Sequence, residues 1–275
     1  MKERQQERRR HAVKAYLKES FLTSAGARPL RMLAEYLEPK SRFDHYRIED
    51  TIVFMGSARV VSREQAEAAV RAAERGEGDL ESARERLAMS RYYEEARELA
   101  RRFTEWSKQL TDEERRFVVC TGGGPGIMEA ANRGASEAKG LSVGLTIALP
   151  AEEFDNQYVT RELSFHFHYF FMRKFWFTYL AKALIVFPGG FGTLDELFEI
   201  MTLRQTRKMN KHLPIVLFGA QYWNEVINFD ALVRHGTIDR EDLALFQRTD
   251  SVDEAYEIVR KHLVEHALRE RGAIL

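Results

Sequence analysis

Short apolar runs alternate with longer amphipathic stretches through most of the chain. Five runs rich in Val, Ile and Leu stand out: TIVFM (51–55), FVVCT (117–121), LSVGLTI (141–147), ALIVF (183–187) and LPIVLFG (213–219). Continuous runs of this kind are typical of parallel strands that are buried on both faces. The alternation of strands with helices predicts an α/β fold, namely a Rossmann-like, doubly wound, mostly parallel sheet flanked by helices.

Charged helical patterns precede this alternation and interrupt it. Residues 1–45 predict a helical N-terminal extension with breaks at Pro29 and Pro39, and residues 46–275 form the Rossmann-like domain. Within that domain, residues 62–110 predict a helical insertion, which Gly76-Glu-Gly78 divides into two helices. Its second half carries apolar residues at three- and four-residue spacing, which form one helical face. They are Tyr92, Ala96, Leu99, Phe103 and Trp106.

The remaining segments are predicted from shorter signals. The alternating stretch ELSFHFH (162–168) indicates a short strand, and helices are expected over 169–180, from 188–193 to about 207, from about 222, and over 251–267. Ser251 and Glu254 have the spacing of a capping box at the start of the last helix.

Composition and charge exclude several classes of protein. The 275 residues contain 42 Lys and Arg against 42 Asp and Glu, so no basic excess indicates a nucleic-acid partner. The single cysteine, Cys120, ends an apolar run and is expected in the core rather than in a disulfide. Charged residues interrupt the most apolar region, 165–187, and the N-terminus lacks an apolar segment after its charges. We therefore expect a cytoplasmic protein without a membrane partner.

Three of the predicted strands end in glycine, in the sequences MGS, TGGGPG and FPGGFGT. Ligands of parallel sheets bind at the carboxyl ends of the strands, and the three ends are expected at one edge. Glycine lets backbone N–H groups approach an anion, and the helix that follows adds its N-terminal N–H groups. Neither a full G-x-G-x-x-G motif nor a P-loop is present, so no standard nucleotide fingerprint applies.

Thr193 and Glu196 allow two interpretations. Their spacing in TLDE is that of a capping box, in which the threonine caps the helix and the glutamate caps back. Alternatively, Thr193 turns its hydroxyl to a phosphate, because a capping threonine is compatible with both roles. The spacing alone does not decide between them.

The aromatic stretch FHFHYFFMRKFW supplies two cations, Arg173 and Lys174, in an otherwise apolar helix. Either both extend to solvent at the helix surface, or one or both point to the strand edge and meet an anion or a carboxylate. His166 and His168 lie two residues apart on the expected strand, but no cysteine or acidic cluster accompanies them, so metal binding is not predicted.

These motifs together resemble the LOG (Lonely Guy) family of nucleoside 5′-monophosphate phosphoribohydrolases. The Arg-Lys pair within MRK (172–174) and the loop PGGFGTLDE (188–196) match the family pattern, an Arg-Lys pair followed by P-G-G-x-G-T-x-x-E. GSAR (56–59) and GGGPGIMEAANRGA (122–135) resemble the family's first two glycine loops. The resemblance covers about residues 50–235, and the added helical regions are like those of longer bacterial relatives. Such proteins have also been described as lysine decarboxylases, but no pyridoxal-phosphate site is evident here.

The resemblance implies a role for each matching residue. Arg173 and Glu196 would form the catalytic pair, and no cofactor is implied. The substrate and its phosphate would be bound by Ser57, Gly124, Lys174, Gly189, Gly190, Gly192, Thr193 and Thr202. A carboxylate near C1′ suits cleavage of an N-glycosidic bond, because positive charge develops on the ribose.

We therefore expect hydrolysis of a nucleoside 5′-monophosphate, of purine or cytokinin type, to a free base and ribose 5-phosphate. Two other functions stay open: a non-catalytic nucleotide sensor on the same fold, and an assembly protein that uses the charged helices of 1–45 and 62–110. The resemblance also implies a homodimer or higher homo-oligomer. The aromatic helix FFMRKFWFTYL, with apolar residues on more than one side, is compatible with a helix-mediated dimer.

Overall fold

The computed structural model describes residues 13–110, 115–148, 156–269 and 272. The chain divides into two compact units at the boundary between Ser41 and Arg42. Within the described residues, no helix is both long enough and apolar enough to cross a membrane.

The first unit contains short helical turns and most of one long helix. These elements are η1 (Ala15–Leu17), α2 (Glu19–Leu22), η2 (Ala25–Ala27) and α3 (Arg28–His45). The predicted break at Pro39 is wrong, because α3 runs through it, whereas Pro29 marks the start of α3 after η2. Pro29 is the second residue of the helix, where a backbone N–H has no intrahelical partner to lose. Pro39 lies in the interior, and the helix continues past it despite the loss of one hydrogen bond.

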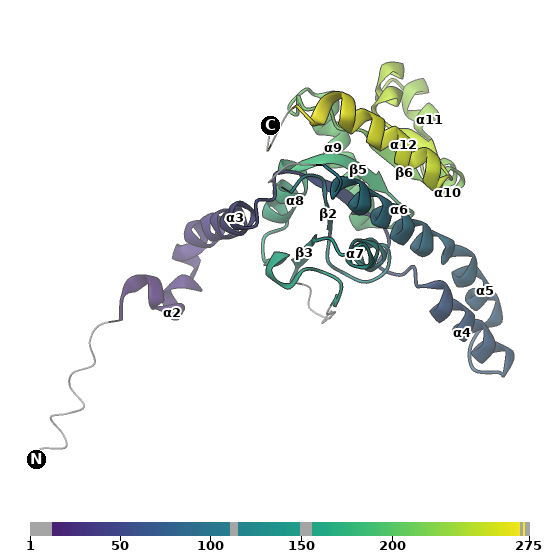
Figure 1. The fold of residues 1–275 in the computed structure, drawn as a ribbon, viewed down its shortest axis with the longest axis horizontal. Coiled ribbons are helices and arrows are strands. Elements are labelled where there is room, and N and C mark those ends of the chain that lie inside the picture. Colours follow the sequence, from purple (N-terminus) through teal and green to yellow (C-terminus); the bar gives the residue numbers. More distant parts are fainter. Residues whose placement is uncertain (1–12, 111–114, 149–155, 270–271, 273–275) are drawn as a thin grey trace, which may run out of the picture. The chain divides into compact units, whose positions relative to one another are not determined.

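The second unit is built on a parallel sheet of seven strands, in the order β4-β3-β2-β1-β5-β6-β7. Figure 1 labels β2, β3, β5 and β6 of this sheet. The strands are β1 (Thr51–Met55), β2 (Val118–Thr121), β3 (Ser142–Ile147), β4 (Ser164–Phe167), β5 (Ala181–Val186), β6 (Ile215–Phe218) and β7 (Gln247–Thr249). All six strand pairs are parallel. The predicted Rossmann-like, doubly wound α/β fold is thereby confirmed.

The strand order reverses at the centre of the sheet. From β1 the chain moves outward through β2 and β3 to β4, then returns to place β5 on the other side of β1 and continues to β7. Residues Ile52 to Met55 pair with Ala183 to Val186. A crevice at such a reversal, outside the carboxyl ends of the strands, is the usual ligand site of open α/β sheets.

Helices connect the strands and cover both faces of the sheet. They are α4 (Arg63–Glu74), α5 (Leu80–Met89), α6 (Arg91–Ser107), α7 (Ile127–Glu137), α8 (Phe170–Tyr179), α9 (Phe191–Gln205), α10 (Ala220–Val226), α11 (Phe229–Arg234) and α12 (Val252–His262), with the short turns η3 (Arg161–Leu163), η4 (Arg240–Leu245) and η5 (Leu263–Ala267). The predicted break at Gly76-Glu-Gly78 is confirmed, and both glycines have positive φ angles. A second break at Ser90 makes three helices of residues 62–110 rather than two.

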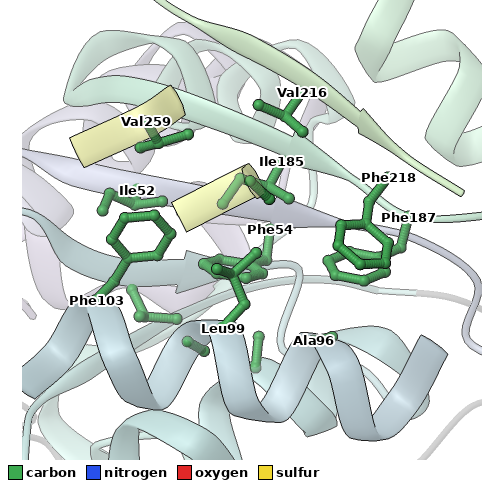
Figure 2. Packing of buried hydrophobic residues seen from close by; sticks show 14 of the residues in the cluster. Ile52, Phe54, Ala96, Leu99, Phe103, Ile185, Phe187, Val216, Phe218 and Val259 are labelled. Carbon is green, nitrogen blue, oxygen red and sulfur yellow. The ribbon is translucent and has the colours of Figure 1, made fainter. Parts of the chain in front are cut away.

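A hydrophobic cluster of buried residues lies between the sheet and α6, α7 and α12. Figure 2 shows Ile52, Phe54, Ile185 and Phe187 from the central strands packed toward Leu99 and its neighbours on α6. The helical face predicted from spacing is the face that α6 buries here. Cys120 is buried in β2, as expected for a small core residue.

The edge strand β7 and the break between α10 and α11 were not predicted. The edge strand β7 has the polar sequence QRT, and two of its three side chains are exposed, so it carries no hydrophobic signal. Asn228 ends the α10 region and caps α11, its side chain accepting a hydrogen bond from the N–H of Ala231 (2.9 Å). A cap of this kind restarts a helix without glycine or proline.

Polar groups are also buried within the second unit. Asp50 and Arg116 form a fully buried ion pair, with 2.7 Å between Oδ2 and Nε. The ammonium of Lys211 donates to the carbonyl oxygens of Thr178 and Tyr179 at the end of α8. Burial lowers the pKa of Lys211 to about 7, and the nearby Lys182 charge acts in the same direction.

Candidate active site

The three glycine loops meet at the reversal point of the sheet, as the sequence predicts. The N–H of Ser57, after β1, donates to the carbonyl of Pro188, after β5 (2.9 Å). The N–H of Ile127, at the start of α7, donates to the carbonyl of Ser57 (3.1 Å). Backbone hydrogen bonds therefore connect all three loops, and Ser57 is their common member.

The second glycine loop serves mainly to let these backbones approach. Gly126 has a φ angle of +72°, and a Cβ there would lie 2.3 Å from the carbonyl oxygen of Ser57. A Cβ on Gly122 would lie 2.6 Å from Nη2 of Arg173. Any larger residue at these positions would displace the first loop or the arginine.

The third loop leads into α9 without a side-chain cap. The N-cap residue of α9 is Gly190, and no side chain accepts a hydrogen bond from the first turn. The capping-box interpretation of Thr193 and Glu196 is therefore wrong, because Thr193 is the third residue inside the helix. A Cβ on Gly189 would lie 2.2 Å from the hydroxyl oxygen of Thr193, so Thr193 packs directly on the loop.

The start of α9 is open and free of acidic residues. A Cβ added to Gly190 or Gly192 would meet no atom within 4 Å. The first N–H groups of a helix have no intrahelical partner and carry the positive end of its dipole. Tyr222 stabilises the loop, because its hydroxyl donates a hydrogen bond to the carbonyl oxygen of Gly189 (2.8 Å). The arrangement is suited to binding an anion.

Arg173 of α8 and Glu196 of α9 face each other beside this helix start. Their Nη1 and Oε1 atoms lie 3.4 Å apart, and each side chain is 13% exposed. The Nε–H of Arg173 also donates to the carbonyl of Leu145 in β3 (2.8 Å), and its guanidinium lies 5.1 Å from the ring centre of Phe177. Three contacts thus fix the arginine, which in turn places a positive charge beside the carboxylate.

Burial raises the pKa of Glu196, and the charge of Arg173 partly opposes this shift. The neighbouring acid Asp195 adds to the rise. A carboxyl group with a raised pKa, in a cleft and beside a fixed cation, is a candidate acid–base group.

Asp195 lies on a different side of α9. Its carboxylate accepts a hydrogen bond from the ammonium of Lys174 (2.8 Å), which also pairs with Glu199 (3.0 Å). Thr202 donates its hydroxyl to the carbonyl of Phe198 (2.7 Å) in the same helix. Lys174 and Thr202 line a separate cleft of about 530 Å³ on this outer side of α9.

A larger cleft of about 1330 Å³ contains most of the predicted site. The predicted residues that line it are Ser57, Arg173, Gly189, Gly190, Gly192, Thr193 and Glu196. Gly124 is not among its lining residues, although Met128, which packs on that glycine, is. The catalytic and binding roles of all these residues stay predictions.

Several lining residues were not predicted. Tyr222 and Val226 reach the cleft from α10, and a second wall comes from the α4–α5 hairpin, the part of the 62–110 insertion that spans residues 63–89. Asn156 and Tyr158, which precede η3, do not line the cleft. Asn156 instead bonds to Asn132 (3.1 Å). The segment 149–155 before it lies outside the described residues.

Comparison with known proteins identifies related sequences over part of the chain. Residues 128–259 match the family profile described as "Possible lysine decarboxylase". A protein of Oryza sativa subsp. japonica, described as a probable cytokinin riboside 5′-monophosphate phosphoribohydrolase LOG4, is 35% identical over 74 residues. That stretch is 27% of this chain and 32% of the rice protein, so the match spans about a third of the relative's length.

Two solved structures are similar to this chain at low sequence identity. TM1055, a structural genomics target, is 18% identical, with 77% of this chain and 99% of that chain covered and a TM-score of 0.47. The molybdenum cofactor carrier protein of Chlamydomonas reinhardtii is 16% identical, with 78% and 99% covered and a TM-score of 0.44.

Proposed function

We propose that this chain hydrolyses the N-glycosidic bond of a nucleoside 5′-monophosphate. The profile match over residues 128–259 and the 74-residue match to the rice LOG4 protein support this proposal. The products would be a free base, of purine or cytokinin type, and ribose 5-phosphate. The main observation behind the proposal is the largely buried Arg173–Glu196 pair, which lies in the same cleft as the open start of α9.

The 5′-phosphate would bind at the start of α9. Gly189, Gly190 and Gly192 leave room for it, and the first-turn N–H groups would donate to its oxygens. The hydroxyls of Thr193 and Ser57 belong to the same cleft. This placement needs no metal ion, because the helix end supplies the positive potential.

Glu196 would act at the ribose carbon C1′. As the bond from C1′ to the base nitrogen breaks, its electron pair leaves with the base and C1′ becomes positive. The ionised carboxylate would stabilise that charge and accept a proton from the attacking water, whose oxygen forms the new bond to C1′. The departing nitrogen takes a proton from solvent and Glu196 releases the one it accepted, so that hydrolysis is complete and the carboxylate is restored.

Arg173 would set the protonation state of Glu196. Burial alone favours the neutral carboxyl group, which cannot accept a proton, whereas the adjacent guanidinium favours the ionised form. Because Leu145 holds the guanidinium from the other side, the arginine would stay in place when substrate binds. Direct contact of Arg173 with the ribose hydroxyls is a further role that the cleft allows.

A non-catalytic nucleotide sensor is the alternative, because the cleft by itself explains binding but not turnover. An assembly role for the charged helices would predict no nucleotide binding at all.

The deciding experiment incubates the purified protein with AMP, GMP, CMP, UMP and a cytokinin nucleotide, measures free base by chromatography, and records the melting temperature with each. Free base supports the enzyme; a raised melting temperature without base supports the sensor. Neither effect, with folded protein, would overturn both.

We also propose that two copies associate through the outer faces of α8 and α9. Phe170 and Phe171 are each 52% exposed, and Phe191, at the start of α9, is 93% exposed. Phe191 and Phe198 line the smaller cleft together with Lys174. Apolar side chains exposed this far are expected to be covered by a partner, and a second copy of the chain offers the same surface.

A further inference from the structure

The α4–α5 hairpin makes the main cleft larger than a nucleoside monophosphate requires. Small-molecule pockets usually enclose roughly 300–1000 Å³, and this cleft measures about 1330 Å³. The hairpin contributes the wall opposite the glycine loops, through residues that include Gln65, Ser82 and Arg86. Figure 1 shows α4 and α5 extending beyond the sheet, and they pack mainly on each other.

Two guanidinium groups in this cleft have no carboxylate partner among the described residues. They belong to Arg59, on the loop after β1, and to Arg86, on α5. Three other arginines of the hairpin pair with acids: Arg63 and Arg71 with Glu67 (3.2 and 3.9 Å), and Arg75 with Glu77 (3.6 Å). Arg84 does not line the cleft.

The remaining charges of the cleft do not cancel these two. Arg173 and Glu196 neutralise each other, and Glu85 is the one further carboxylate among the lining residues that the structure describes. Lining charges therefore leave one net positive group, in addition to the positive end of α9. A cleft with two separated positive regions is suited to a ligand with two separated anionic groups.

We propose that Arg59 and Arg86 form a second anion subsite, so that the preferred ligand is a nucleotide with a second phosphate group besides the 5′-phosphate. This inference rests on the proposed function, because the first phosphate is placed at α9. Arginine suits the task, since its planar guanidinium can donate two parallel hydrogen bonds to a phosphate. The added volume under the hairpin would hold the second group.

The test compares affinities for AMP and for its two ribose bisphosphates, adenosine 2′,5′-bisphosphate and adenosine 3′,5′-bisphosphate, by calorimetric titration at one ionic strength. At least one bisphosphate should bind about tenfold more tightly than AMP, as expected for a charged hydrogen-bonded contact. In Arg86→Ala and in Arg59→Ala, the ratio of the Kd for AMP to the Kd for that bisphosphate should fall toward one. Arg84→Ala is the matched control, because it removes an equal charge from an exposed residue of the same helix that does not line the cleft.

Each result has a definite meaning. If both bisphosphates bind no better than AMP, or if Arg84→Ala reduces the preference as much as Arg86→Ala does, the second subsite is refuted. Hydrolysis of AMP in that case would leave the proposed function intact. Conversely, a bisphosphate preference that depends on Arg86, without release of base from any nucleotide, would support the subsite and overturn the proposed hydrolase.

Discussion

Replacing Glu196 with glutamine tests the proposed chemistry most directly. The substitution keeps the size of the side chain and removes the charge that would stabilise C1′ and accept the proton. General acid–base groups contribute typically 10²- to 10⁴-fold to a rate. At about 1.4 kcal/mol for each factor of ten, the loss corresponds to about 3 to 5 kcal/mol in the activation barrier. Turnover should fall by that factor, while AMP still binds at α9.

The same substitution should change stability little. Burial raises the pKa of Glu196, so the folded protein is stabilised when the charge is removed. Against this, the variant loses the charge that pairs with Arg173, although the glutamine side-chain oxygen can still accept a hydrogen bond from that guanidinium. Arg173 keeps its hydrogen bond to Leu145 and its access to the cleft. We expect these opposing effects to leave a change in the free energy of unfolding of about 1 kcal/mol, the typical size for a single substitution.

The assay measures kcat from release of free base, Kd for AMP by titration, and unfolding by denaturant. Asp195→Asn is the matched control, since Asp195 is the next residue and also a carboxylate, but it is 55% exposed and paired with Lys174. The control should keep turnover near the original value. Turnover within about threefold of the original in Glu196→Gln, or an equal loss in both variants, would refute a catalytic role for Glu196.

Three further predictions concern the anion site, the oligomer and a buried lysine. Gly192→Glu should weaken AMP binding at least about tenfold, because a carboxylate in the first turn repels phosphate. The same carboxylate complements the helix dipole, so the melting temperature should stay the same or rise. Unchanged AMP affinity would place the phosphate elsewhere. Phe198→Asp should yield monomers in analytical ultracentrifugation, and an unchanged sedimentation coefficient would exclude this interface. Lys211 has a folded-state pKa of about 7, below the ordinary value near 10.4. Between these two pH values the unfolded chain binds more protons than the folded one, so the free energy of unfolding rises with pH. Lys211→Met should flatten that rise in denaturant titrations by about 1 kcal/mol or more, and equal slopes would refute the shift.

The sheet and its loops were predictable because their signals are local. Each central strand is a continuous apolar run, and each loop at the strand reversal contains glycine. The helix start at Gly190 was not predicted, because glycine and threonine are both acceptable N-cap residues and only Thr193 has a glutamate three positions later. Packing decided the outcome: the Thr193 side chain lies against Gly189 and is 7% exposed, so it belongs inside the helix.

The hairpin wall and the Tyr222 contact could not be predicted, because both depend on tertiary placement. The 62–110 pattern shows that helices form, but not that α4 and α5 turn toward the glycine loops. Tyr222 reaches Gly189 only because β6 pairs with β5, which brings the start of α10 beside the third loop. Pairing partners of strands are not encoded in local periodicity.

The sequence of α9 also explains how an anion site and two acids coexist within one motif. The first turn contains no acidic residue, so its N–H groups and dipole remain available to a phosphate. Consecutive residues on a helix point about 100° apart, and this separates the two acids: Asp195 meets Lys174 in the smaller cleft, whereas Glu196 meets Arg173 in the larger one. The Arg-Lys pair of α8 thus provides each acid with its own cation. Only Glu196 then lies in the cleft with the phosphate site, where a carboxylate held by Arg173 would face the ribose carbon instead of the phosphate.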